Sequence, residues 1–149
     1  MFVDLGKIRD VGLAAAARAG EILLNYWGKA HTVEKKGAIN LVTEADLASE
    51  NAIIQLIRSV FPDHRVLAEE SGVTLGTDTY EWIIDPLDGT TNFVHSLPHV
   101  ATSIACEQKG IICAGGVYDP FRDELFYAEK NQDAFLNNKK IRVSSAKNL

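Results

Sequence analysis

Two stretches in the first sixty residues repeat apolar side chains at the three- and four-residue steps of an amphipathic helix. The first covers residues 4–29, with Gly12 and Gly20 as small positions that would let another element approach closely. The second begins near Thr43, where Thr43-Glu44-Ala45-Asp46 is close to a capping box, and ends at Phe61-Pro62. Residues 31–42 between them read as irregular or as a hairpin. The chain therefore opens with two helices.

Beyond the second helix the pattern changes to short apolar runs that are typical of strands. One is expected at 65–68 and another at 81–84, which Asp85-Pro86 should stop, with a polar loop over 73–80 between them. Later strand candidates are separated by short turns and lie at 100–108, 111–119, 124–129, 133–136 and 139–143. Short connections imply antiparallel pairing. The sequence predicts an α+β fold, a layered sandwich of two amino-terminal helices packed on a mainly antiparallel sheet.

Composition narrows the class of protein. The 149 residues are 46% apolar and fit one domain, or part of a larger one. A formal charge of -5 without a Lys/Arg block disfavours direct binding to nucleic acid or to a membrane. Cys106 and Cys113 lie in apolar runs and are expected to be buried free thiols, and no secretion signal or membrane span is visible. These features predict a cytoplasmic protein.

The densest chemistry lies just after the strand expected at 81–84. That strand delivers Asp85 to its carboxyl end, and Pro86 is expected to force a turn that brings Asp88 back to the same point. Two facing carboxylates repel unless a cation lies between them, and oxygen-only ligands suit Mg²⁺ or Mn²⁺. Gly89 allows close approach of the backbone, and Thr90-Thr91 should start a helix whose N–H groups bind phosphate. Asp-Pro and Asp-Gly are also common turn dipeptides, but the complete string after an apolar strand argues against an ordinary turn.

Two other acidic positions each have an ordinary alternative. Glu69-Glu70-Ser71 follows the short strand at 65–68 and, taken alone, would be a solvated loop. Asp46 stands in the first turn of the second helix, where the helix dipole favours a carboxylate.

Together these segments resemble a known family. Trp82 to Phe93 resembles the signature Asp-Pro-x-Asp-Gly-Thr-x-x-Phe of the inositol monophosphatases and related phosphatases. Glu69-Glu70-Ser71 and Leu41 to Asp46 resemble its two upstream motifs, in the family's order and spacing. The resemblance runs from the first helix to about Val143 and corresponds to the family's amino-terminal half. It implies the layered sandwich of the inositol monophosphatase and fructose-bisphosphatase type. It also implies a magnesium-dependent, lithium-sensitive phosphatase that hydrolyses inositol monophosphate or a related sugar phosphate with a metal-activated water.

The resemblance also assigns metal ligands. Glu69 and Asp85, with the backbone carbonyl of Leu87, would hold one Mg²⁺ or Mn²⁺, and Asp85 and Asp88 a second. Glu69 would also bind a weaker third metal. Two further residues are assigned more loosely as neighbours of this metal loop: Glu70 and Lys35.

Catalytic and substrate-binding roles follow from the same resemblance. Glu69 would help to activate the nucleophilic water and Thr90 would orient it, with Asp46 hydrogen-bonded to the Thr90 hydroxyl. Gly89, Thr90 and Thr91 would contact the phosphate. Family members are usually dimers, so a homodimer is expected for the full-length form.

One departure concerns the second metal. In the family it also takes an Asp from a Trp-Asp motif in the carboxyl-terminal half, whereas Trp27 and Trp82 are the tryptophans of this sequence and neither precedes an Asp. We therefore expect residues 1–149, as an apparently truncated amino-terminal domain, to be inactive or nearly so when alone. We also expect the fragment to self-associate, to recruit its missing half or to pack loosely.

Two alternatives remain open. The segment from Gly89 to His95 favours the inositol monophosphatase branch over a fructose-1,6-bisphosphatase or a dual-specificity phosphatase of the same superfamily. A non-catalytic, protein-binding module is the other alternative, since some bacterial relatives also act in transcription complexes.

Overall fold

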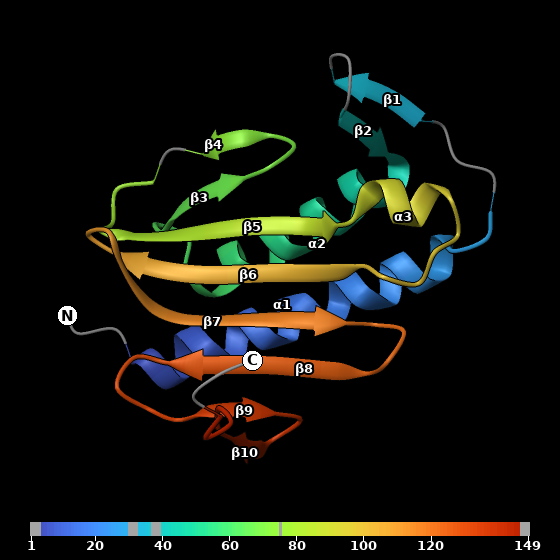
Figure 1. The fold of residues 1–149 in the computed structure, drawn as a ribbon. Coiled ribbons are helices and arrows are strands. Elements are labelled where there is room, and N and C mark those ends of the chain that lie inside the picture. Colours follow the sequence, from blue (N-terminus) through green and yellow to red (C-terminus); the bar gives the residue numbers. More distant parts are fainter. Residues whose placement is uncertain (1–3, 30–32, 37–39, 75, 147–149) are drawn as a thin grey trace.

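The computed structural model describes residues 4–29, 33–36, 40–74 and 76–146 (Figure 1). Its helices are α1 (Leu5–Tyr26), α2 (Glu44–Val60) and the short α3 (Thr90–Val94). Its strands are β1 (Val33–Lys36), β2 (Asn40–Thr43), β3 (Arg65–Ala68), β4 (Gly72–Thr74), β5 (Tyr80–Asp88), β6 (Ala101–Gln108), β7 (Ile111–Asp119), β8 (Glu124–Glu129), β9 (Ala134–Leu136) and β10 (Lys139–Ile141).

Eight of the strands form one sheet in the order β10-β9-β8-β7-β6-β5-β3-β4. Neighbouring strands in this sheet are antiparallel, apart from the parallel pair β3 and β5. The remaining two, β1 and β2, pair with each other, and β2 lies beside α3 (Figure 1). The predicted α+β sandwich of helices on a mainly antiparallel sheet is confirmed.

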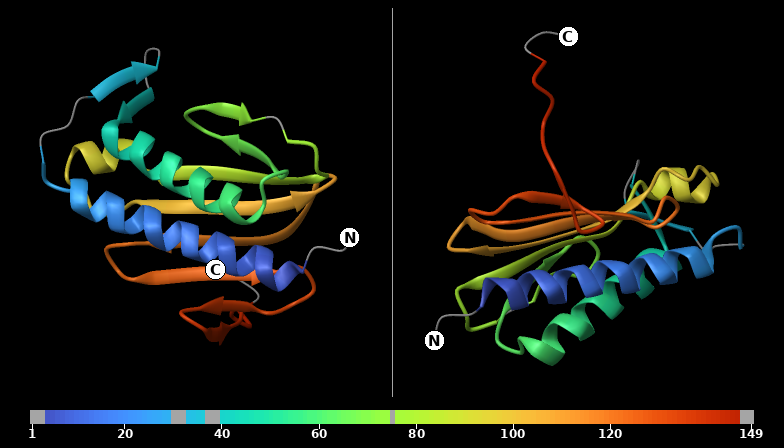
Figure 2. Two further views of the ribbon diagram at one scale, coloured as in Figure 1. Left: turned by 180° about the vertical axis from the view of Figure 1, so that it is seen from behind. Right: turned by 90° about the horizontal axis from the view of Figure 1, so that it is seen from below.

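Both long helices lie on the same face of the large sheet (Figure 2). Helix α1 packs on β6 and β7, and α2 packs on α1 and β5. A Cβ atom at Gly12 would lie 3.2 Å from the ring of Trp82, and one at Gly20 would overlap the ring of Tyr118. The two small positions therefore let α1 lie close against the strands, as the sequence predicts.

The opposite face of the sheet is more open. Over β6 to β10 it carries a groove of about 370 Å³ whose lining includes Val117, Phe126 and Ile141. These side chains are 41%, 39% and 36% exposed. Within the described residues, neither long helix covers this face (Figure 2).

Strand β5 differs from its prediction, because it does not stop at Asp85-Pro86. It continues to Asp88 and pairs with β6 throughout, with a shift of register between Asp85 and Asp88. Proline has no N–H to give to a strand ladder, and an irregularity of this kind is where a sheet tolerates one. The Pro86 carbonyl accepts a hydrogen bond from Thr102 Oγ1 at 3.0 Å. Asp88 is therefore carried past Asp85 by an irregular strand, and the predicted turn was wrong.

Smaller differences concern where elements end. Helix α1 ends at Tyr26 instead of residue 29, with Gly28 two residues later at a φ of +70°. The predicted loop at 73–80 instead contributes β4, which pairs with β3. Of the two alternatives for residues 31–42, irregular or hairpin-like, the antiparallel pairing of β1 with β2 agrees with the second. Both cysteines are buried and free, as expected. No described helix combines the length and apolar character needed to cross a membrane.

Candidate active site

The parallel pair β3 and β5 brings two of the predicted acidic residues together. Ala68 on β3 is paired with Ile84 on β5, so Glu69, just past the end of β3, lies beside Asp85 on the adjacent parallel strand β5. The Glu69 N–H donates to the carbonyl of Ile84 at 3.2 Å, which extends the strand pairing by one residue. The parallel pairing thus brings Glu69 and Asp85, which are sixteen residues apart in sequence, to one edge of the β3–β5 pair.

The electrostatics of this edge centre on Asp85. Burial raises its pKa to about 7, and the carboxyls of Glu69 and then Asp88 add to the rise. A hydrogen bond from the Leu87 N–H to Asp85 Oδ1, at 3.2 Å, works in the opposite direction. Negative charge is therefore crowded here, so the edge favours either a shared proton or a bound cation.

The donor set at this edge fits a hard divalent cation. The groups that face one another are carboxylate oxygens, which prefer Mg²⁺ or Mn²⁺ to softer metals. Within the described residues, however, no three Asp, Glu, His or Cys side chains are arranged as a complete metal site. The chain thus offers carboxylates that suit a cation without forming a closed cage around it.

Gly89 connects the irregular end of β5 to α3. Its φ is +91°, and a Cβ atom there would lie 2.8 Å from the carbonyl oxygen of His99. Both facts exclude a side chain at this position without local rearrangement. The Asn92 side-chain amide also donates to the His99 carbonyl, at 2.8 Å. Helix α3 begins at Thr90, as predicted, whereas the phosphate contacts of Gly89, Thr90 and Thr91 stay a prediction.

Asp46 reaches this edge from α2. Its Oδ1 accepts a hydrogen bond from Thr90 Oγ1 at 3.0 Å, and its Oδ2 accepts from the Thr43 backbone N–H at 2.9 Å and from the Thr43 hydroxyl. Asp46 is only 1% exposed. Asp46 therefore caps the start of α2 and also accepts a hydrogen bond from Thr90, so both roles that the sequence suggests for it are present.

The Thr90 hydroxyl has two possible acceptors. It lies 3.0 Å from Asp46 Oδ1 and 3.1 Å from the Leu87 carbonyl oxygen. A hydroxyl carries one proton, so these acceptors compete for it. If the Leu87 carbonyl oxygen binds another group, the Thr90 hydroxyl donates its proton to Asp46. The lone pairs of the Thr90 oxygen are then free to accept a hydrogen bond.

Sequence reasoning missed Glu50, which lies one helical turn after Asp46. Its side chain accepts hydrogen bonds from two consecutive backbone amides, Glu70 N–H at 2.8 Å and Ser71 N–H at 2.9 Å. It is 2% exposed. The available signal was an acidic residue four positions after Asp46, on the same face of the helix. The side chain of Lys35 lies outside the described part of the structure.

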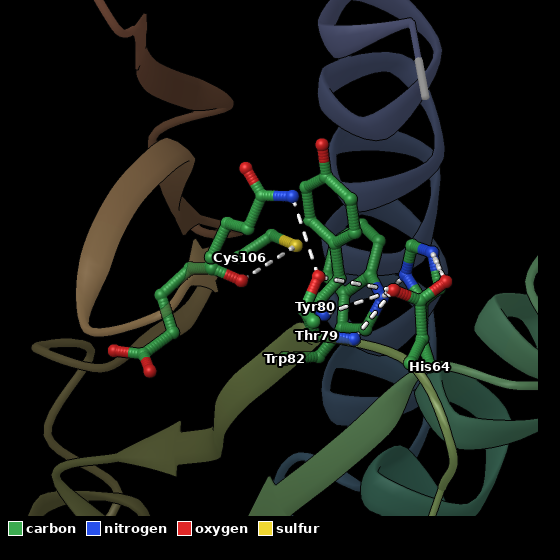
Figure 3. Close-up of polar contacts among 8 residues, drawn as sticks. His64, Thr79, Tyr80, Trp82 and Cys106 are labelled. Carbon is green, nitrogen blue, oxygen red and sulfur yellow. Dashed lines mark hydrogen bonds and ion pairs between the residues drawn. The ribbon is translucent and has the colours of Figure 1, made fainter. Parts of the chain in front are cut away.

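A second polar cluster lies at the other end of β5 (Figure 3). The Trp82 indole N–H donates to His64 Nδ1 at 3.0 Å, and His64 Nε2 lies 3.8 Å from Asp78 Oδ2. The imidazole is stacked on the rings of Phe61 and Tyr80, with centroids 4.4 and 5.1 Å away. Burial lowers the pKa of His64, an effect that Asp78 partly offsets. His64 is therefore a well-packed, neutral histidine. Its surroundings lack the cluster of like charges that surrounds Asp85.

Comparison with known proteins relates the chain to one family. A sequence profile described as "Inositol monophosphatase family" matches residues 4–149. Nus factor SuhB of Pasteurella multocida is 42% identical over 148 residues, which cover 97% of this chain and 55% of that protein. Inositol monophosphatase 2 of Solanum lycopersicum is 45% identical over 147 residues, covering 94% of this chain and 55% of that protein.

Solved structures give the same picture. The extragenic suppressor protein suhB of Bartonella henselae has a TM-score of 0.92 and 40% identity, covering 94% of this chain and 55% of that one. The IMPase of Thermotoga maritima has a TM-score of 0.84 and 39% identity, covering 91% and 53%. The chain thus spans about half the length of the relatives it matches.

Proposed function

Because the chain belongs to the inositol monophosphatase family, we propose that it supplies most of the active site of a metal-dependent phosphomonoesterase. The substrate would be inositol monophosphate or a related sugar phosphate, and the products the free alcohol and inorganic phosphate. The observation that carries the proposal is that Glu69 and Asp88 lie close enough to Asp85 for their carboxyls to add to the effect of burial, which raises the pKa of Asp85 to about 7. Such an arrangement is suited to a bound cation.

In this proposal Glu69, Asp85, Asp88 and the Leu87 carbonyl hold Mg²⁺, which Mn²⁺ could replace. When bound, the ions would lower the pKa of a water molecule and stabilise the leaving oxygen. The chain's own residues would do the rest. Glu69 would accept hydrogen bonds or a proton from the attacking water.

Thr90 and Asp46 form the water-orienting pair of the proposal. Asp46 is fixed by its bonds to Thr43, so it can hold the Thr90 hydroxyl proton in one direction. The Thr90 lone pairs would then accept a hydrogen bond from the water. The backbone amides of Gly89, Thr90 and Thr91 would contact the phosphate oxygens.

The remaining parts of the proposal concern the whole protein. We expect a cytoplasmic homodimer, sensitive to lithium, with a carboxyl-terminal half that adds the distal Asp ligand of the second metal. A fructose-1,6-bisphosphatase or dual-specificity phosphatase would use the same residues. Residues 1–149 alone should be inactive, and the apolar side chains on the open face of β7 and β8 should bind a hydrophobic dye.

A second candidate function is a protein-binding role without catalysis. It is favoured by the name Nus factor SuhB, which several of the relatives carry, among them one from Escherichia coli K12 that is 44% identical over 143 residues. The two functions need not use the same surface.

The test is a phosphatase assay with inositol 1-phosphate, fructose 1,6-bisphosphate and Mg²⁺. It is run on the full-length form and on residues 1–149 side by side. Release of phosphate by the full-length form at rates of about 1 to 10³ per second would support the enzyme. A full-length form without activity on either substrate would leave the protein-binding role as the better account.

A further inference from the structure

The buried side chain of Glu50 is the most unusual polar group near the site. A carboxylate removed from water is costly unless it is fully hydrogen-bonded. Glu50 is 2% exposed, and both of its oxygens have a partner: Oε2 accepts from the Glu70 N–H at 2.8 Å and Oε1 accepts from the Ser71 N–H at 2.9 Å. One charged group thus holds two successive amides of a segment that is twenty residues away.

The segment that Glu50 holds is the short link between β3 and β4. It consists of Glu69, Glu70 and Ser71, because β3 ends at Ala68 and β4 begins at Gly72. Strand pairing fixes Glu69 from one side, through its N–H bond to Ile84 at 3.2 Å. The two bonds from Glu50 fix the backbone that immediately follows. Glu69 is therefore clamped on both sides of its Cα atom.

Glu50 also shares its helix face with Asp46. The two residues are four apart on α2, so they lie one above the other on the same side. Asp46 holds the Thr90 hydroxyl at 3.0 Å, while Glu50 holds the link that contains Glu69. One turn of a single rigid helix thus fixes both sides of the proposed active site, the β3 end and the start of α3.

We infer that Glu50 is a positioning residue that sets the Glu69 carboxylate in place for metal binding. This inference rests on the proposed function, because it assumes that Glu69 is a metal ligand. In this role Glu50 would contact neither the metal nor the substrate. Its role is to make the β3–β4 link rigid before the metal arrives, so that little ordering is needed when a cation binds.

The test compares Glu50→Gln with Glu44→Gln in the full-length form. Both remove one negative charge from α2, but Glu44 is exposed and serves as the matched control. Glutamine keeps the shape of Glu50 while offering one acceptor, so one of the two amide bonds must be lost. Mn²⁺ binding is measured by electron paramagnetic resonance titration, and exchange of the Glu70 and Ser71 amide protons is measured in the metal-free protein.

For Glu50→Gln we expect faster exchange of one or both amides and Mn²⁺ binding weakened about 10- to 100-fold. The Mg²⁺ concentration for half-maximal activity should rise by a similar factor, with turnover at saturating Mg²⁺ changed only a few-fold. Glu44→Gln should match the wild type in every measurement. If Glu50→Gln does not fold, Glu50→Asp is measured instead. Aspartate keeps the negative charge, but its side chain is too short to reach both amides.

The outcomes separate this inference from the proposed function. A folded Glu50 variant that binds Mn²⁺ as tightly as the wild type would overturn the positioning role, even if its melting temperature falls. A wild-type protein that does not bind Mn²⁺ at all would instead overturn the metal site itself, and the positioning role with it.

Discussion

The two ends of β5 carry opposite solutions to the burial of polar groups. Near its start, the Trp82 indole donates to a neutral His64 at 3.0 Å (Figure 3). The imidazole is also stacked on the ring of Phe61. Towards its carboxyl end, Asp85 lies near Glu69 and Asp88, and burial together with these carboxyls raises the pKa of Asp85 to about 7. The same strand therefore has one end whose polar groups satisfy each other and one end whose charges repel.

The difference shows that one part of β5 contributes to stability, whereas another part is suited to binding. The aromatic end adds to the free energy of unfolding without a ligand, because each buried polar group there has a partner. The carboxylate end lowers that free energy in the metal-free protein, and we propose that a bound cation removes this cost. Changes at the two ends should therefore have separate effects, one on stability and one on activity.

The largest effect is expected for Asp88→Asn in the full-length form. The amide keeps the shape of the side chain but removes the charge that the proposed second metal would need, so phosphatase turnover should fall by about 1,000-fold or more. The fold should be unaffected, as judged by circular dichroism. Asp133→Asn, in the exposed segment before β9, is the matched control and should keep full activity. Unchanged turnover in Asp88→Asn would contradict the comparison, because the carboxylate end of β5 would then not be the part that supports activity.

A smaller effect, and one on stability alone, is expected for Trp82→Phe. This change leaves a space in the core and removes the donor to His64 Nδ1, so the free energy of unfolding should fall by about 2 kcal/mol. Urea unfolding measures the loss, and turnover per folded molecule should stay at the wild-type value. Trp27→Phe, at a half-buried position, should cost less. Loss of activity in folded Trp82→Phe would mean that the two ends of β5 are coupled.

The smallest effect concerns pH and His64. Burial lowers the pKa of His64 in the folded protein below its ordinary value of 6.5, so the unfolded chain takes up a proton first as pH falls. The stability contributed by the neutral imidazole is present in full above pH 6.5 and is lost as pH drops from 6.5 towards the folded pKa. The slope in that window should approach about 1.4 kcal/mol per pH unit.

His64→Gln is the control for this slope, since it cannot titrate. Urea unfolding between pH 5 and 7 should give a flatter dependence for the variant than for the wild type. Equal slopes would show that His64 is not the group responsible.

The sequence predicted much of the fold because local signals decided it. The capping box at Thr43 and the spacing of turns after residue 99 gave α2 and the strands from β6 to β10 to within a few residues. The continuation of β5 through Pro86 could not be predicted in this way. It depends on the register shift against β6, which is a property of the pairing of two distant segments.

The candidate site shows the same limit. Short motifs marked Glu69, Asp85 and Asp88, and the resemblance supplied the contact between Asp46 and Thr90. Glu50 belongs to no such motif, and its spacing of four residues from Asp46 is a weak signal, because a glutamate within a helix usually faces water. Its partners are backbone amides about twenty residues away. Since every residue except proline has a backbone N–H, the residue types at these positions do not reveal the contact.

The most direct test of the account compares the wild type with Asp85→Asn, in urea unfolding of the full-length form at pH 8, with EDTA and with Mg²⁺. The folded pKa of Asp85 is raised from 3.8 to about 7, so its ionised form costs stability in the metal-free protein, fully so above pH 7. With EDTA, Asp85→Asn should therefore be more stable than the wild type, because the amide removes the repelled charge. With Mg²⁺ the order should reverse, because only the wild type gains a bound cation. If Mg²⁺ leaves the wild type unchanged, or if the variant is the less stable protein in EDTA as well, the carboxylate end of β5 is not a metal site.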